Sequence, residues 1–210
     1  MQKVICLSGQ IESGKDAAGK YLVKRLRNIE PYRKLYPLWK RVAFGDEVKR
    51  VLSENYGVSL DFIEEWKRVD ETPPGFDMTI RRALMWIGDG FRQIRASIWI
   101  DKLFEKHSPV DAHLVISDGR YLSELQAATD REGINVAIHR PSHGNDIDHP
   151  SEAQLKPYID ALAERYHKSR PVSDPDSPFD YFLLNASSLD DLYDTIEDSL
   201  IPFIKERFDD

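Results

Sequence analysis

The chain has 210 residues, which is enough for one domain with a sizeable core. Its formal net charge of −7 argues against a polymeric nucleic acid as partner, but it allows a small phosphorylated substrate. The apolar runs are too short to span a membrane, the N-terminus carries no signal-like segment, and a single cysteine gives no disulfide framework, so we expect a cytoplasmic protein.

A phosphate-binding loop is predicted at the start of the chain. Residues 4–7 are an apolar run typical of a buried strand, and residues 16–27 have apolar side chains at helical spacing. Between them, two glycines and a lysine occupy the positions of a phosphate-binding loop, in which backbone N–H groups and a helix N-terminus hold the anion. The lysine is expected to reach the β- and γ-phosphates of a nucleotide. The residues expected at the phosphates are Gly9, Ile11, Glu12, Ser13, Gly14, Lys15, Asp16 and Ala17.

The position after the lysine departs from the usual loop pattern. A serine or threonine commonly stands there, and its hydroxyl binds Mg²⁺, whereas here the residue is Asp16, followed by Ala17. A carboxylate beside phosphates is repulsive unless a cation lies between them. Asp16 therefore either holds Mg²⁺, directly or through water, or only stabilises the helix N-terminus. We favour the metal role.

Further along the chain, strands alternate with helices. Strands are predicted at 41–45, 113–117, 135–139 and 179–184. Helices are predicted from a cap at Asp46 to 55–57, over 60–68, over 79–87 and, after a break at 88–90, over 91–106. Later helices are expected from Ser123 through 124–131, over 151–165 and over 189–208. The remaining proline-rich or polar segments, 30–40, 70–77, 141–150 and 169–178, are predicted to be loops.

This alternation predicts an α/β fold, a three-layer α/β/α domain around a five-stranded parallel sheet. Ligands in such folds bind at the carboxyl ends of the strands. Polar residues stand at several of these ends: Asp46, Asp118, Arg120 and Arg140. We expect one domain over residues 1–210, with a helical acceptor-binding region at about 55–107 and a lid at 140–170.

Three features favour a small-molecule kinase among proteins with such a loop. The chain is short, the Asn-Lys-x-Asp base-reading motif of GTPases is absent, and arginines gather in the middle of the chain. Arginine binds phosphate through a planar, bidentate fork, although Arg81, Arg82 or Arg95 could each equally be a solvated surface residue. Asp118 could order Mg²⁺ or orient the acceptor, or else cap a helix. The arginines are Arg68, Arg81, Arg82, Arg92, Arg95, Arg120 and Arg140.

The chain resembles the deoxynucleoside monophosphate kinases of tailed bacteriophages, in the P-loop nucleoside monophosphate kinase superfamily. The motifs that carry the resemblance are residues 7–16, Ala43–Lys49, Trp86–Arg92, Ile98–Ile100, Val115–Glu124 and His149–Glu152. It departs from the family at Ala17, at Gly119, at 121–123 and at Asn185-Ala186, where a common Asn-Asp near the adenine is missing.

The resemblance implies transfer of the ATP γ-phosphoryl to a deoxynucleoside monophosphate, with Mg²⁺, a mobile lid and a homodimer. The candidate catalytic residues are Lys15, Asp118, Arg120 and Arg140. The candidate acceptor-binding residues are Asp46, Arg81, Trp86, Arg92 and Arg120, and the candidate metal ligands are Asp16 and Asp118. Two other readings stay open: a kinase for another acceptor, such as phosphomevalonate or dephospho-coenzyme A, and a nucleotide-binding module without catalysis.

Overall fold

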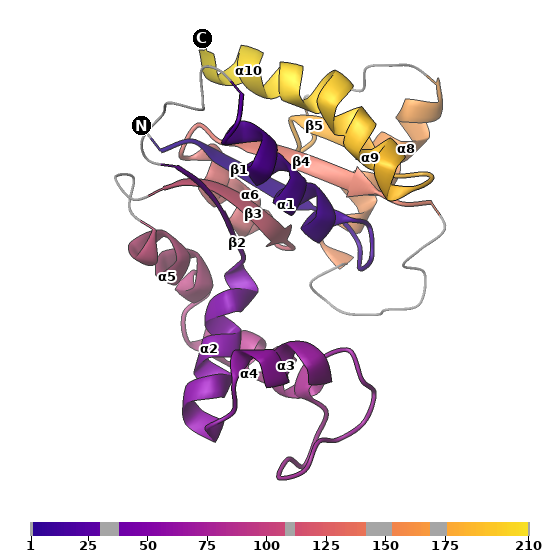
Figure 1. Ribbon diagram of the computed structural model, residues 1–210. Coiled ribbons are helices and arrows are strands. Elements are labelled where there is room, and N and C mark those ends of the chain that lie inside the picture. The colour runs from indigo at the N-terminus through magenta and orange to yellow at the C-terminus, as the bar shows by residue number, and fades with distance from the viewer. Residues whose placement is uncertain (1, 30–37, 108–111, 142–152, 169–175, 210) are drawn as a thin grey trace. The chain divides into compact units, whose positions relative to one another are not determined.

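A parallel five-stranded sheet forms the centre of the first of two structural units (Figure 1). The computed structural model describes residues 2–29, 38–107, 112–141, 153–168 and 176–209. The sheet belongs to the unit formed by Met1–Val42 and His107–Asp210, and its strand order is β2-β3-β1-β4-β5. The strands are β1 (Val4–Ser8), β2 (Trp39–Val42), β3 (His113–Gly119), β4 (Ile134–His139) and β5 (Tyr181–Leu184).

Helices cover both faces of this sheet. α1 and the C-terminal run of α9, η2 and α10 pack on one face, where alternate strand residues such as Leu7, Val115 and Val136 are fully buried. α6 and α8 pack on the other face, where Tyr166 of α8 meets Phe182 of β5. The predicted three-layer α/β/α fold is therefore confirmed. The bounds are α1 (Lys15–Leu26), α6 (Leu122–Thr129), α8 (Lys156–Lys168), α9 (Leu189–Thr195), η2 (Ile196–Leu200) and α10 (Ile201–Asp209).

The second unit, Ala43–Lys106, is helical in its described structure. Its core combines one side of three helices through Leu52, Ile63, Ile80 and Ala83. Burial of each of the three larger side chains, Leu52, Ile63 and Ile80, contributes about 1.5–3 kcal/mol relative to exposure, so this unit has a core of its own. The helices are α2 (Phe44–Tyr56), α3 (Leu60–Trp66), α4 (Ile80–Ile94) and α5 (Ile98–Lys106).

Two expected boundaries in the helical unit are wrong. The strand predicted at 41–45 ends at Val42, and Ala43 is the N-cap of α2, so Asp46 lies in the first turn of the helix and does not cap it. A short apolar run does not distinguish the end of a strand from the start of a helix. The break predicted at 88–90 is absent, because α4 runs through both glycines to Ile94. Gly88 is buried and its carbonyl accepts a hydrogen bond from Trp99 Nε1 at 2.9 Å, so a tertiary contact outweighs glycine's low helix propensity.

Two helix starts also differ from expectation. α6 begins at Leu122 and ends at Thr129, two residues earlier than predicted at either end. The helix predicted over 151–165 is seen as α8 from Lys156, with Pro157 in its first turn, where no backbone N–H is needed. Residues 142–152, the first part of the lid expected at 140–170, fall outside the described residues, and α8 lies in the remainder of that range.

Candidate phosphate-binding site

The loop between β1 and α1 is shaped by two close backbone approaches. A Cβ on Gly9, whose φ is +156°, would lie 2.2 Å from the carbonyl oxygen of Ile138 in β4. Gly14 has φ +100°, and a Cβ there would lie 2.7 Å from Nδ2 of Asn185. Neither position accepts a side chain without displacing its neighbour, and the left-handed φ of Gly14 favours glycine in addition. Steric contacts therefore explain why both positions of this predicted phosphate-binding loop are glycine.

Asn185 anchors this loop from the far end of the chain. Its Nδ2 donates a hydrogen bond to the Ser13 carbonyl oxygen at 3.0 Å, and its backbone N–H donates to the carbonyl of His139 at 2.8 Å. Both Asn185 and Ser13 are buried, so the bond is shielded from water. A linear motif does not indicate this role, because the pairing spans 172 positions and depends on β4 and β5 lying side by side. Asn185 is a positioning residue for the loop.

Lys15 lies at the start of α1 with its ammonium group over the loop. Lys15 Nζ donates to the carbonyl oxygens of Gly9 at 2.7 Å and Gln10 at 2.6 Å, and it lies 3.4 Å from Ser13 Oγ. Gly14 is the N-cap of the helix, so the first N–H groups of α1 point toward the same loop. A positive charge, a helix N-terminus and loop N–H groups together form an environment that favours a polyphosphate.

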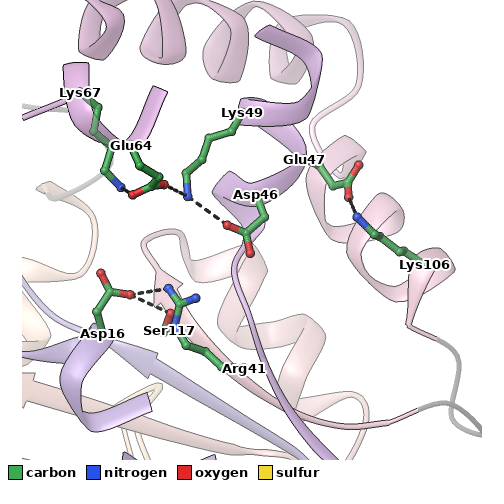
Figure 2. Close-up of polar contacts among 9 residues, drawn as sticks. All are labelled: Asp16, Arg41, Asp46, Glu47, Lys49, Glu64, Lys67, Lys106 and Ser117. Carbon is green, nitrogen blue, oxygen red and sulfur yellow. Dashed lines mark hydrogen bonds and ion pairs between the residues drawn. The ribbon is translucent and has the colours of Figure 1, made fainter. Parts of the chain in front are cut away.

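Asp16, the residue after the lysine, is bound to two neighbouring strands. Its Oδ1 accepts hydrogen bonds from Nη2 of Arg41 in β2 at 2.6 Å and from Oγ of Ser117 in β3 at 3.1 Å (Figure 2). Neither partner was predicted from the sequence. Arg41 and Ser117 follow Trp39 and Val115 by two residues, which places both side chains on the sheet face that carries α1. This placement is a consequence of strand register and is invisible in a linear motif.

The carboxylates near the loop are too few to hold Mg²⁺ by themselves, so they fit a Mg²⁺ ion that is bound largely by the nucleotide. Within the described residues, no group of three or more histidine, cysteine or acidic side chains could hold a metal ion. Mg²⁺ in nucleotide sites commonly takes one or two protein carboxylates and otherwise binds phosphate oxygens and water. Asp16 and Asp118 are the carboxylates that could contribute here. Asp118 is half-buried in β3, directly after Ser117.

Cys6, in the strand that leads into the loop, is not a reactive group. Burial raises the pKa of the Cys6 thiol well above its ordinary value, and the negative charges of Glu124 and Asp118 raise it further. The thiol therefore stays protonated at neutral pH, as expected for a small buried core residue.

Arg120 and Arg140 follow β3 and β4 directly. Glu124, buried in the first turn of α6, accepts hydrogen bonds from the backbone N–H groups of Arg120 at 2.8 Å and Tyr121 at 3.2 Å, which fixes the turn after β3. Both arginine side chains are partly exposed, and neither guanidinium has a hydrogen bond or ion pair with any other described residue. At the carboxyl ends of parallel strands, such groups suit an anionic ligand.

The candidate acceptor residues of the helical unit do not form one cluster. Asp46 pairs with Nζ of Lys49 at 3.0 Å (Figure 2), and Arg92 lies 3.5 Å from the Asp89 carboxylate. Arg81 and Arg92 are three turns apart along one side of α4, about 16 Å, while Trp86 is displaced by more than 100° around the helix. Trp86 is 64% exposed. The structure thus leaves these residues as separate candidates.

The sheet, the helices on both of its faces and the loop of Gly9, Gly14 and Lys15 define a P-loop protein of the three-layer α/β/α class. No protein-family model matches the chain. A protein of Acanthamoeba polyphaga mimivirus, provisionally described as a deoxynucleotide monophosphate kinase, is 29% identical over 171 residues, which cover 73% of this chain and 82% of that protein.

Two solved structures with a similar fold are shikimate kinases of low sequence identity. A shikimate kinase from Acinetobacter baumannii, in complex with shikimate, gives a TM-score of 0.48 at 13% identity and covers 99% of this chain and 96% of its own. A shikimate kinase from Aquifex aeolicus gives 0.45 at 20% identity, with coverage of 96% and 98%. The described part of the chain contains no helix with the length and apolarity needed to cross a membrane.

Proposed function

We propose that the chain is a kinase that transfers the γ-phosphoryl group of ATP to a deoxynucleoside monophosphate, giving ADP and the deoxynucleoside diphosphate. The observation that carries this proposal is the loop between β1 and α1, with Lys15 Nζ 2.7 Å from the Gly9 carbonyl at the N-terminus of α1. The similarity to the mimivirus protein, over most of both chains, supports the deoxynucleotide as acceptor.

Two sets of residues are proposed to bind the two anionic substrates. Loop N–H groups and Lys15 hold the β- and γ-phosphates, while Arg120 and Arg140 hold the acceptor phosphate and the group in transfer. An oxygen of the acceptor phosphate attacks the γ-phosphorus, and the bond from that phosphorus to the oxygen bridging to the β-phosphate breaks as ADP leaves. Mg²⁺, when bound, neutralises charge on the phosphate oxygens. Asp16 and Asp118 are the carboxylates proposed to hold it.

The proposal also includes three further features of the protein. These are a lid at residues 140–170, an acceptor-binding role for the helical unit, and a homodimer, for which light scattering would give twice the 24.3 kDa chain mass. In this role, Asp46, Arg81, Trp86 and Arg92 are proposed to contact the acceptor nucleotide.

The test is ADP release from ATP and Mg²⁺ against a panel of acceptors. The panel contains the four deoxynucleoside monophosphates, the corresponding ribonucleotides, phosphomevalonate and dephospho-coenzyme A. We expect release stimulated by one or more deoxynucleotides and absent in a Lys15→Met control. ADP release stimulated only by phosphomevalonate or dephospho-coenzyme A would mean that the proposed deoxynucleotide acceptor is wrong. Binding of ATP without ADP release for any acceptor would favour a non-catalytic nucleotide-binding module.

A further inference from the structure

The ion pair between Asp16 and Arg41 stands at the position where a nucleotide's phosphates are expected. Asp16 is the second residue of α1, directly after the loop lysine, and its Oδ1 is 2.6 Å from Nη2 of Arg41. The two side chains are unequally exposed, at 70% for Asp16 and 28% for Arg41. Arg41 is thus the more fixed partner, held in an edge strand that pairs with β3, and the carboxylate is the group that reaches it.

Without a ligand, such an exposed pair contributes little to folding. Water screens the charges, and exposed ion pairs are typically worth between zero and about 1 kcal/mol. A polyphosphate changes this balance, because it excludes water and brings several negative charges toward the Asp16 carboxylate. A negative side chain in the first turn of the helix then opposes the ligand that the same helix N-terminus favours. A resident cation on Asp16 removes that opposition.

We infer that Arg41 is a positioning residue of the phosphate site, whose guanidinium neutralises Asp16 and holds its carboxylate against Ser117 so that the loop can bind a nucleotide before a divalent cation is in place. The inference rests on the proposed nucleotide-binding function and extends it to a residue outside the loop motif. Ser117 contributes the second contact to the same oxygen, 3.1 Å from Oδ1, and fixes the direction in which the carboxylate points. Mg²⁺ arriving with the nucleotide supplies the same neutralisation.

The test is ATP affinity, measured by calorimetry in EDTA and again with Mg²⁺, for the full chain and five variants. These are Arg41→Gln, Arg41→Lys, Asp16→Asn, the double variant Arg41→Gln with Asp16→Asn, and Arg27→Gln as control. Arg27 also joins α1 to β2, through a 2.7 Å bond from its Nε to the Trp39 carbonyl oxygen, but at the C-terminal end of α1. Its substitution therefore removes the same charge without touching Asp16.

We expect Arg41→Gln to weaken metal-free ATP binding about tenfold, and Mg²⁺-supported binding by less than about threefold. Arg41→Lys should keep most of the affinity, since it keeps the charge. Asp16→Asn in the Arg41→Gln background should restore metal-free affinity to within about threefold of Asp16→Asn alone. Arg27→Gln should match the unsubstituted chain.

The double variant separates electrostatics from structure. If the loss in Arg41→Gln persists after Asp16 is neutralised, Arg41 acts only through packing and the inference is wrong. Equal losses with and without Mg²⁺ would also overturn it. A chain that binds ATP with this pattern but phosphorylates no acceptor would overturn the proposed function and leave the role of Arg41 intact, whereas no ATP binding at all would overturn both.

Discussion

The helical unit pairs several of its cationic side chains with carboxylates, whereas the described part of the sheet unit combines such pairs, as in Arg41 with Asp16, with two arginines at strand ends that are not paired in this way. In the helical unit, Lys49 pairs with Glu64 at 2.8 Å, Arg50 with Glu47 at 2.7 Å and Arg95 with Asp101 at 2.6 Å (Figure 2 shows the first). In the sheet unit, Arg120 and Arg140 directly follow β3 and β4, the two strands that flank β1. Their guanidinium groups have no such partner among the described residues.

This difference separates charges that stabilise the fold from charges that are available to a ligand. A cation already held by a carboxylate has a counter-charge, and moving it to a phosphate requires that pair to break. A cation at the carboxyl end of a parallel strand, without a protein counter-charge, can bind an anion directly. Arg81 and Arg82 are exceptions within the helical unit, since neither guanidinium pairs with another described residue, and Arg81 remains a candidate for the acceptor.

The largest expected effect is that of Lys15→Met. The substitution removes the ammonium group that we assign to the β- and γ-phosphates, while the methionine keeps a long side chain over the loop. We expect turnover to fall by about 10³-fold, the cost typical of removing one electrostatic contact to the group in transfer. Steady-state rates of ADP release measure it.

The control for Lys15→Met is thermal unfolding, which should stay within a few degrees of the unsubstituted chain. The bonds lost, to the carbonyl oxygens of Gly9 and Gln10, are partly buried loop contacts and do not belong to the core. Turnover near the original rate in a folded variant would contradict the loop assignment.

A smaller effect is expected for Arg120→Ala. Without a protein partner in the described residues, this guanidinium is predicted to act on the acceptor phosphate, so its loss should lower kcat/KM for the acceptor by about 10²-fold with kcat and KM both affected. Stability and ATP affinity should be unchanged. Acceptor titrations at saturating ATP measure the two constants separately.

Arg131→Ala is the matched control for this prediction. Arg131 lies at the other end of α6 and donates to the Ala127 carbonyl oxygen at 2.7 Å, so it belongs to the group of cations that bind the protein itself. Its substitution should leave both acceptor constants unchanged. An effect of Arg120→Ala on ATP affinity alone would contradict its role toward the acceptor and weaken the comparison between the two units.

The fold and the loop between β1 and α1 could be predicted from the sequence, because both depend on local residue patterns. Apolar runs mark the buried parallel strands, and the spacing of Gly9, Gly14 and Lys15 marks the turn between strand and helix. The contacts that complete the site were not predictable in this way. Arg41 reaches Asp16 and Asn185 reaches Ser13 only because strand order brings distant segments together.

A similar limit explains the two wrong boundaries around the helical unit. The glycines at 88 and 90 predict a break from their intrinsic propensity, yet the packing of Trp99 on the Gly88 carbonyl keeps α4 continuous. The start of α2 at Phe44 likewise follows from where the chain leaves the sheet, which residues 41–45 do not encode locally. In both cases tertiary structure decided between local alternatives.

The smallest expected effect is that of Glu47→Gln, which tests the ion pairs of the helical unit. The Glu47 side chain is 6% exposed and pairs with Arg50 at 2.7 Å and with Lys106 at 2.5 Å. Lys106 and Arg50 can turn to water when the charge is lost, so we expect a decrease of about 1–2 kcal/mol in the free energy of unfolding, less than for a fully buried pair. Denaturant unfolding measures it, and ATP affinity should not change.

The pH dependence of stability gives the same contact a second test. Burial alone would raise the pKa of the Glu47 carboxyl, but hydrogen bonds and charges from Lys106 and Arg50 outweigh it, so the pKa is lowered. Since the unfolded chain then binds a proton more readily than the folded one, the stabilisation is present above the ordinary glutamate pKa of about 4.3 and is lost as pH falls through the lowered value. The difference in unfolding free energy between Glu47→Gln and the unsubstituted chain should therefore shrink below about pH 4. A difference that stays constant with pH would mean that glutamine disrupts packing, and that the pair is not what stabilises this helix.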